Sequence, residues 1–198
     1  MLPTVPPVVL ASTSPSRMAL LRAAGIAFTA VSPPVDESTV QDADPVRVAE
    51  GRAALKAGAV QAPGSIVIGA DQVAHLEALR LSKPKDPADH RAQLRLLRGR
   101  VHTLSTGVVI RLDAREERFV LQSRLRFRDD VTDAELDAYV ATGEGSHCAG
   151  GYAAEGLGAQ LIAEIEGDFF NVLGLPVLHV IGALRRFGWR PSFPHASA

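Results

Sequence analysis

The chain has 198 residues, enough for one sizeable domain with its own core or for two small ones. Its 46% hydrophobic and 22% charged residues are typical of a folded soluble protein. The 21 Lys and Arg residues nearly balance the 22 Asp and Glu residues, which argues against a general binder of nucleic acid or membrane surfaces, because both need a summed positive field. The charge is nevertheless uneven, since residues 79–128 are mainly basic and residues 129–170 contain acids but no Lys or Arg.

The first part of the chain alternates predicted strands with predicted helices. Short apolar strands are expected over residues 8–11 and 26–31. Between them, a helix over 15–24 follows the Ser-Pro start and Gly end that are typical of helix termini. An Asp-Pro pair opens another helix over about 45–62.

The second helix and the strand after it build the predicted core. Val48, Leu55 and Ala59 fall on one side of the helix, which we expect to face the sheet. The β-branched run 65–70 predicts a central strand buried on both faces, with Asp71 at its exit.

The rest of the chain completes one α/β domain with a mixed sheet. The predicted elements are a hairpin to residue 82, a helix over 87–98, paired strands over 101–112 and 119–127, a helix over 133–142, a strand over 160–165 and a helix over 176–187. We expect a single domain over 1–198, with its core at about 8–187 and a tail over 188–198.

A hydroxyl-rich turn connects the first strand to the first helix. Its sequence is Leu-Ala-Ser-Thr-Ser-Pro-Ser-Arg, residues 10–17. Backbone N–H groups at a helix N-terminus, together with Arg17, form a site for phosphate. The alternative is ordinary helix capping by Ser14 with a solvated Arg17.

Carboxylates at two places suggest a cation site. Asp36 and Glu37 follow the second strand, and Asp71 follows the central one. Magnesium prefers oxygen ligands, so two carboxylates suffice when substrate phosphates supply others. Asp71 could also activate an attacking water, whereas Asp36 has turn capping as its alternative role.

Lys83 lies in the basic loop Ser-Lys-Pro-Lys-Asp, residues 82–86. A lysine there can bind phosphate as a point charge, or it can belong to a solvated loop.

Other kinds of site are disfavoured. The single Cys148 excludes a disulfide framework within the chain, and it points away from the adjacent His147 if the segment is extended. The scattered histidines do not match zinc-ligand spacing, and the glycine motifs of nucleotide-binding P-loops are missing. The N-terminus lacks the pattern of a secretory signal, and no apolar run nears the roughly 18 residues of a membrane span, so a cytoplasmic location is expected.

Taken in order, these segments resemble the Maf family of nucleoside triphosphate pyrophosphatases, over about residues 8–187. The matching stretches are Leu-Ala-Ser-Thr-Ser-Pro from residue 10, Val-Asp-Glu from 35, Ile-Gly-Ala-Asp-Gln from 68, Lys-Pro from 83, Leu-Arg-Gly from 97 with His102, Ala-Gly at 149–150 and Gly-Leu-Pro from 174.

The resemblance implies a Maf and inosine-triphosphatase-like α/β fold, with a strongly bent mixed β-sheet flanked by helices around a deep central cleft. It also implies a frequent homodimer. The implied activity is house-cleaning hydrolysis, dependent on Mg²⁺ or Mn²⁺, between the α- and β-phosphates of a nucleoside triphosphate, giving the monophosphate and pyrophosphate.

The resemblance also assigns roles to matching residues. Asp71 matches the general base, and Glu37 an acidic residue near the metal, which Asp71 would also bind. The phosphate-binding positions match Ser12, Arg17 and Lys83, while Arg52 stands where the family's lysine of the second helix is expected. Arg52 keeps the charge but replaces a point donor with a planar fork.

Details within the motifs are similar to the branch that acts on 7-methyl-GTP. Gln72, the His-Cys-Ala-Gly run at 147–150 and Glu155 carry this similarity. A carboxylate suits the N–H donors and positive charge of 7-methylguanine. Ser16 departs from the large residue of both branches and cannot stack on a base.

Two rival functions remain. One is a pyrophosphatase for dTTP, UTP or modified pyrimidine nucleotides. The other is a nucleotide-binding regulator of cell division that needs neither Asp71 nor metal.

Overall fold

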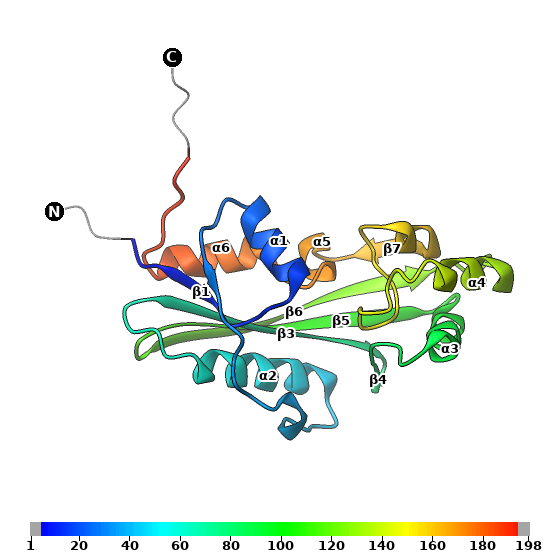
Figure 1. The fold of residues 1–198 in the computed structure, drawn as a ribbon, viewed down its shortest axis with the longest axis horizontal. Helices are drawn as coiled ribbons and strands as arrows, with labels where there is room; N and C mark the ends of the chain where they lie inside the picture. The colour runs from blue at the N-terminus through cyan, green and yellow to red at the C-terminus, as the bar shows by residue number, and fades with distance from the viewer. Residues whose placement is uncertain (1–4, 194–198) are drawn as a thin grey trace, which may run out of the picture.

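The computed structural model describes residues 5–193, and it has a mixed α/β fold built on one seven-stranded sheet (Figure 1). Its strands are β1 (Val8–Leu10), β2 (Thr29–Ala30), β3 (Ile66–Leu76), β4 (Leu79–Leu81), β5 (Val101–Leu112), β6 (Arg115–Phe127) and β7 (Ile162–Glu166). They lie in the order β2-β1-β3-β5-β6-β7, and β4 pairs with β3. β1 runs parallel to β2 and β3, while all other pairs are antiparallel.

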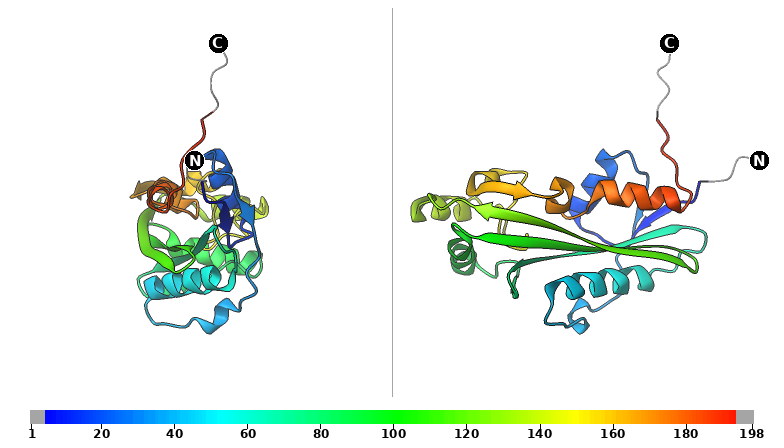
Figure 2. Two further views of the ribbon diagram at one scale, coloured as in Figure 1. Left: turned by 90° about the vertical axis from the view of Figure 1, so that its left-hand side faces the viewer. Right: turned by 180° about the vertical axis from the view of Figure 1, so that it is seen from behind.

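Helices cover both faces of the sheet. They are α1 (Pro15–Ala23), α2 (Pro45–Ala59), α3 (Pro87–Leu97), α4 (Asp133–Ala141), α5 (Phe169–Val172) and α6 (Val177–Arg186), with the short 3-10 helices η1 (Glu37–Thr39) and η2 (Leu157–Leu161). Figures 1 and 2 show α2 on one face, α1 and α6 on the other, and α3 and α4 at one end. Within residues 5–193, no helix is long and apolar enough to cross a membrane.

The helix starts agree with the sequence because side chains cap them. Asp44 accepts a hydrogen bond from Val46 N–H at 2.9 Å, and Asp86 accepts one from Asp89 N–H at 2.8 Å. Thr132 and Glu135 form a capping box at the start of α4. Each cap satisfies N–H groups that the first helical turn leaves without partners.

The central strand differs from its prediction. β3 continues past residue 70 to Leu76 and then turns into the short hairpin with β4. Asp71 therefore lies in the middle of β3, opposite Gly107 of β5, and its prediction at a strand exit is wrong. The strand stays regular there because its backbone pairs with β5 from Val67 to His75.

The two faces of the sheet are packed differently. Large side chains, including Leu10, Leu21 and Leu184, fill the face under α1 and α6. On the α2 face, a Cβ atom at Gly69 would lie 2.3 Å from Ala53 O, and one at Gly107 would lie 2.5 Å from Ala49 O. These glycines let the helix backbone approach the sheet closely.

The basic and acidic segments of the sequence form ion pairs with each other in the fold. Basic side chains of α3 and β6 form ion pairs with acidic side chains of α4 and β7. These pairs include Arg91 with Asp137, Arg95 with Asp133, Arg124 with Glu166 and Arg126 with Glu164. The two charged segments of the chain thus largely neutralise each other on the surface, where such pairs contribute little stability.

Candidate active site

A cleft of about 1000 Å³ opens beside the centre of the sheet. Segments far apart in the sequence line it: the turn after β1, α2, the middle of β3, the loop after β4, and the segments around residues 147–155 and 172–174. All the predicted site residues lie on its wall. They are Ser12, Ser16, Arg17, Glu37, Arg52, Asp71, Gln72, Lys83 and Glu155.

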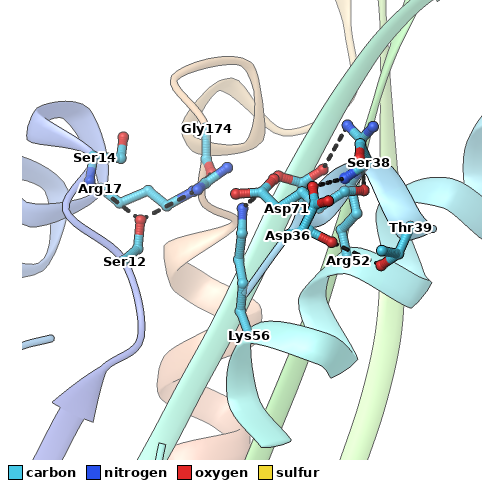
Figure 3. A network of polar contacts seen from close by, with 11 residues as sticks. Ser12, Ser14, Arg17, Asp36, Ser38, Thr39, Arg52, Lys56, Asp71 and Gly174 are labelled. Atoms are coloured by element: carbon cyan, nitrogen blue, oxygen red, sulfur yellow. Dashed lines mark hydrogen bonds and ion pairs between the residues drawn. The ribbon is translucent and has the colours of Figure 1, made fainter. Parts of the chain in front are cut away.

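At the base of the cleft, Asp71 pairs with a lysine of α2 (Figure 3). Lys56 Nζ lies 2.7 Å from Asp71 Oδ1 and 2.9 Å from Glu37 Oε2. The side chains of Lys56 and Asp71 are only 8% and 9% exposed, whereas that of Glu37 is 42% exposed. Asp71 Oδ2 is also buried and has no hydrogen-bond partner among the described residues.

Lys56 was not predicted as a site residue. The expected inner face of α2 was that of Val48, Leu55 and Ala59, but the structure buries Lys56 and leaves Leu55 and Ala59 only half-buried. A useful signal was present, because Lys56 follows Arg52 by four residues and so lies on the same side of the helix.

Arg52 lies one turn earlier on α2. Its Nε donates a hydrogen bond to Glu37 O at 3.2 Å, and its Nη1 lies 3.8 Å from Asp71 Oδ2. Arg52 was predicted to stand where the family's lysine of the second helix is expected. In the structure, the lysine that contacts both Glu37 and Asp71 is Lys56. The arginine adds a second cation beside them.

The Arg17 guanidinium is bonded both to the turn after β1 and to the segment after α5. Arg17 Nε donates to Gly174 O at 3.0 Å, and Nη1 donates to Ser12 Oγ at 3.4 Å. Burial lowers the pKa of Arg17, while Asp71 and Glu37 oppose this shift. Ser14 makes no side-chain cap, and its N–H instead donates to Ser12 Oγ at 3.2 Å. The alternative of a capping Ser14 with a solvated Arg17 is therefore wrong.

Asp36 caps a turn, which was the alternative to a role in cation binding. Its Oδ1 accepts a hydrogen bond from Ser38 N–H at 2.9 Å and caps η1. The hydrogen bonds from Ser38 lower the pKa of Asp36. The capped turn places the next residue, Glu37, beside Lys56.

The remaining predicted site residues lie on other parts of the cleft wall. Gln72 Nε2 donates to Thr106 Oγ1 at 3.0 Å and to Asn171 O at 2.6 Å, so this amide is already engaged. Ser16, Lys83 and Glu155 are exposed.

The carboxylates fit a divalent cation. Glu37 and Asp71 offer hard oxygen ligands, and Asp71 Oδ2 is buried without a partner within residues 5–193. In the same described part of the chain, no group of three or more His, Cys, Asp and Glu side chains could hold a metal ion by itself. The pair thus suits a cation that takes further ligands from phosphate and water.

The charges on the cleft wall favour an anion. Five basic side chains line it, against three acidic ones. Two of the acids, Glu37 and Asp71, are paired with Lys56. Besides Lys56, the basic side chains are Arg17, Arg52, Arg80 and Lys83, and the wall as a whole carries two more basic than acidic groups. Such an arrangement attracts a polyphosphate.

Known proteins are similar to this sequence over nearly its whole length. A model of the family described as "Maf-like protein" matches residues 7–187. The chain is 42% identical to the "Nucleoside triphosphate pyrophosphatase" of Rhodospirillum rubrum, over 93% of this chain and 96% of that protein. It is 41% identical to the "dTTP/UTP pyrophosphatase" of Thermus thermophilus, over 94% and 97% of the two chains. A "dTTP/UTP pyrophosphatase" of Moorella thermoacetica is 42% identical, with 91% and 94% covered.

Proposed function

Because this chain belongs to the Maf family, we propose that it is a nucleoside triphosphate pyrophosphatase, which hydrolyses the α–β phosphate bond and releases a nucleoside monophosphate and pyrophosphate. The observation that carries this proposal is the buried Asp71, held by Lys56 at the base of a cleft whose wall carries more basic than acidic side chains. A carboxylate acceptor beside a basic polyphosphate site is what water attack on a phosphoanhydride needs.

In this mechanism Asp71 accepts a proton from the attacking water. Lys56 holds Asp71 Oδ1, so Asp71 Oδ2 is the oxygen available for the proton. The water then attacks the α-phosphorus, and the bond to the β-phosphate breaks. An Asp71 carboxylate fixed by the ion pair needs no reorientation before the reaction.

Basic side chains stabilise the leaving pyrophosphate. Arg17 is preorganised by its bonds to Ser12 and Gly174, and Arg52 lies beside Asp71. Lys83 approaches from the loop after β4. Each well-placed donor of this kind contributes about 3 kcal/mol to transition-state stabilisation.

Glu37 and Asp71 are the residues that would hold Mg²⁺ or Mn²⁺, which supplies Lewis-acid neutralisation of the phosphate charge when bound. The chain's own part is to keep the two carboxylates together. Lys56 bridges them through one oxygen of each, and Arg52 fixes the backbone of Glu37.

Among bases, thymine and uracil are the first candidates. Two of the relatives described above are named as dTTP/UTP pyrophosphatases, which favours these substrates over the 7-methyl-GTP suggested by the motifs. The amide nitrogen of Gln72 donates to Thr106 and Asn171, so its N–H groups are not free to read a base, which also weakens the argument for a purine.

A second candidate, 7-methyl-GTP, rests on Glu155. Its exposed carboxylate lines the cleft and forms no ion pair within the described part of the chain. An acceptor there complements the N–H donors and positive charge of 7-methylguanine.

Pyrophosphate release from dTTP, UTP, GTP and 7-methyl-GTP, measured with Mg²⁺ and with Mn²⁺, tests the proposal. We expect turnover with dTTP and UTP to exceed that with the two purines. A preference for 7-methyl-GTP that decreases when Glu155 is replaced by Gln would support the second candidate instead. Nucleotide binding without pyrophosphate release would indicate a nucleotide-binding regulator and contradict the proposed enzymatic activity.

A further inference from the structure

A tight loop carries Glu155 into the cleft. Residues 153–156 form a turn closed by a hydrogen bond from Gly156 N–H to Ala153 O at 3.2 Å. Ala154 and Glu155 at the tip line the cleft, and η2 begins directly after the turn. The segment lies between α4 and β7 along the chain (Figure 1).

Both ends of this loop are fastened to the end of α4. At its start, Ala153 N–H donates to the buried Tyr139 hydroxyl at 3.1 Å. At its end, the N–H groups of Leu157 and Gly158 donate to the two oxygens of Glu144, at 3.0 and 2.8 Å. Only the tip between these anchors faces the cleft, and Glu144 itself is not part of the cleft wall.

The Glu144 anchor is ionic and well held. Its backbone N–H donates to Thr142 Oγ1 at 3.1 Å, which fixes the turn after α4. Partial burial raises the pKa of Glu144, but the backbone hydrogen bonds from Leu157 and Gly158, with a further contribution from the Tyr139 side chain, outweigh this effect, so the pKa is lowered overall. Charge-assisted bonds to backbone N–H groups are stronger than neutral ones.

The loop sequence is fitted to this anchor. A Cβ atom at Gly156 would lie 2.3 Å from Glu144 Oε1, and one at Gly158 would lie 2.5 Å from Ala153 O. The two glycines of the Gly-Leu-Gly run at 156–158 therefore have local physical explanations: Gly156 leaves room for the Glu144 carboxylate, and Gly158 for the backbone of Ala153.

We propose that Glu144 is a positioning residue for base selection, which fixes the 153–156 loop and so sets where Ala154 and Glu155 meet the nucleotide base. This inference rests on the proposed function, since it names the loop as the part of the cleft that contacts the base. The phosphate-binding residues lie on other segments, so loosening this loop should affect recognition of the base and not of pyrophosphate.

Two variants break the anchor from opposite sides. Glu144→Gln removes the charge that accepts both N–H bonds. Gly156→Ala leaves Glu144 intact but places a Cβ atom where its carboxylate lies, 2.3 Å from Glu144 Oε1. Glu164→Gln, at an exposed residue of β7 paired with Arg126, is the matched charge control.

The measurement is calorimetric binding of α,β-methylene-UTP, α,β-methylene-GTP and pyrophosphate. Loss of a charge-assisted anchor should weaken binding of the preferred analogue about tenfold in both variants and bring the two nucleotide affinities closer together. Pyrophosphate affinity and the Glu164→Gln control should stay at the wild-type level. Thermal melts show whether each variant is folded. If Glu144→Gln does not fold, the binding data of Gly156→Ala decide the test.

Equal losses for the nucleotides and pyrophosphate, or unchanged discrimination between the two analogues, would overturn the role of Glu144. Wild-type protein that binds the analogues but releases no pyrophosphate from UTP or GTP would overturn the enzymatic proposal alone. Wild-type protein that binds neither analogue would overturn both.

Discussion

Lys56 Nζ lies 2.7 Å from Asp71 Oδ1, and this buried pair joins the last turn of α2 to the middle of β3. The same ammonium reaches Glu37 Oε2 at 2.9 Å. Because a buried charge is costly unless it is paired, each of the two groups depends on the other. The pair therefore links the stability of the fold to the chemistry of the cleft.

Replacing Lys56 by Met should destabilise the protein and abolish turnover. The substitution leaves Asp71 buried without its nearest cation, which costs about 3 kcal/mol in the free energy of unfolding. Denaturant unfolding at pH 7 measures this loss. The double variant Lys56→Met/Asp71→Asn should be more stable than Lys56→Met alone, and additive losses in the two single variants would contradict the pairing.

Replacing Gly107 by Ala should push α2 away from the sheet. Its new Cβ would meet Ala49 O at 2.5 Å, and overpacking against backbone costs about 1–3 kcal/mol. Because α2 carries Arg52 and Lys56, activity should fall together with the melting temperature. Gly182→Ala on α6 is the control, since its Cβ has space and alanine favours helix. A Gly107→Ala protein with normal activity would contradict the close approach.

The buried His102 should make stability depend on pH. Burial, with a smaller contribution from His75, lowers the pKa of His102 to about 4, and Nε2 lies 2.5 Å from the Tyr152 hydroxyl. The unfolded value is about 6.5, so the fold favours the neutral ring; this contribution is complete above pH 6.5 and is lost as the pH falls toward 4. The loss amounts to about 3 kcal/mol.

Unfolding of wild type and His102→Gln between pH 7.5 and 4.5 isolates this effect from that of the carboxylates. The wild type should lose more stability than the variant over that range. Parallel curves would show that His102 does not carry the difference.

The helix boundaries could be predicted because they depend on local chemistry. Asp44, Asp86 and Thr132 cap α2, α3 and α4 at the predicted starts of these helices. β5 pairs with β6 as predicted, although β6 begins at Arg115 and not at residue 119. Polar residues at strand ends and in loops likewise led to Arg17 and Lys83. Local signals such as these are independent of the rest of the fold.

The contacts of α2 could not be predicted in the same way. Its inner face is small, with Ala49 and Ala53 against Gly107 and Gly69, so a search for large apolar residues selects Leu55 and misses Lys56. The spacing of Arg52 and Lys56 places both on one side of the helix, but only the sheet reveals that Lys56 is buried there. For the same reason Asp71 looked like a strand end, since nothing local shows that β5 continues alongside it.

Hydrolysis of UTP in H₂¹⁸O with Mg²⁺, followed by mass spectrometry of the products, tests the central claim most directly. We predict pyrophosphate without label and uridine monophosphate carrying one ¹⁸O, because water attacks the α-phosphorus. Asp71→Asn should lose at least about 100-fold in rate while keeping a cooperative melt, as expected for loss of a general base. Label in released orthophosphate, release of a nucleoside diphosphate, or near-normal turnover by Asp71→Asn would contradict the account.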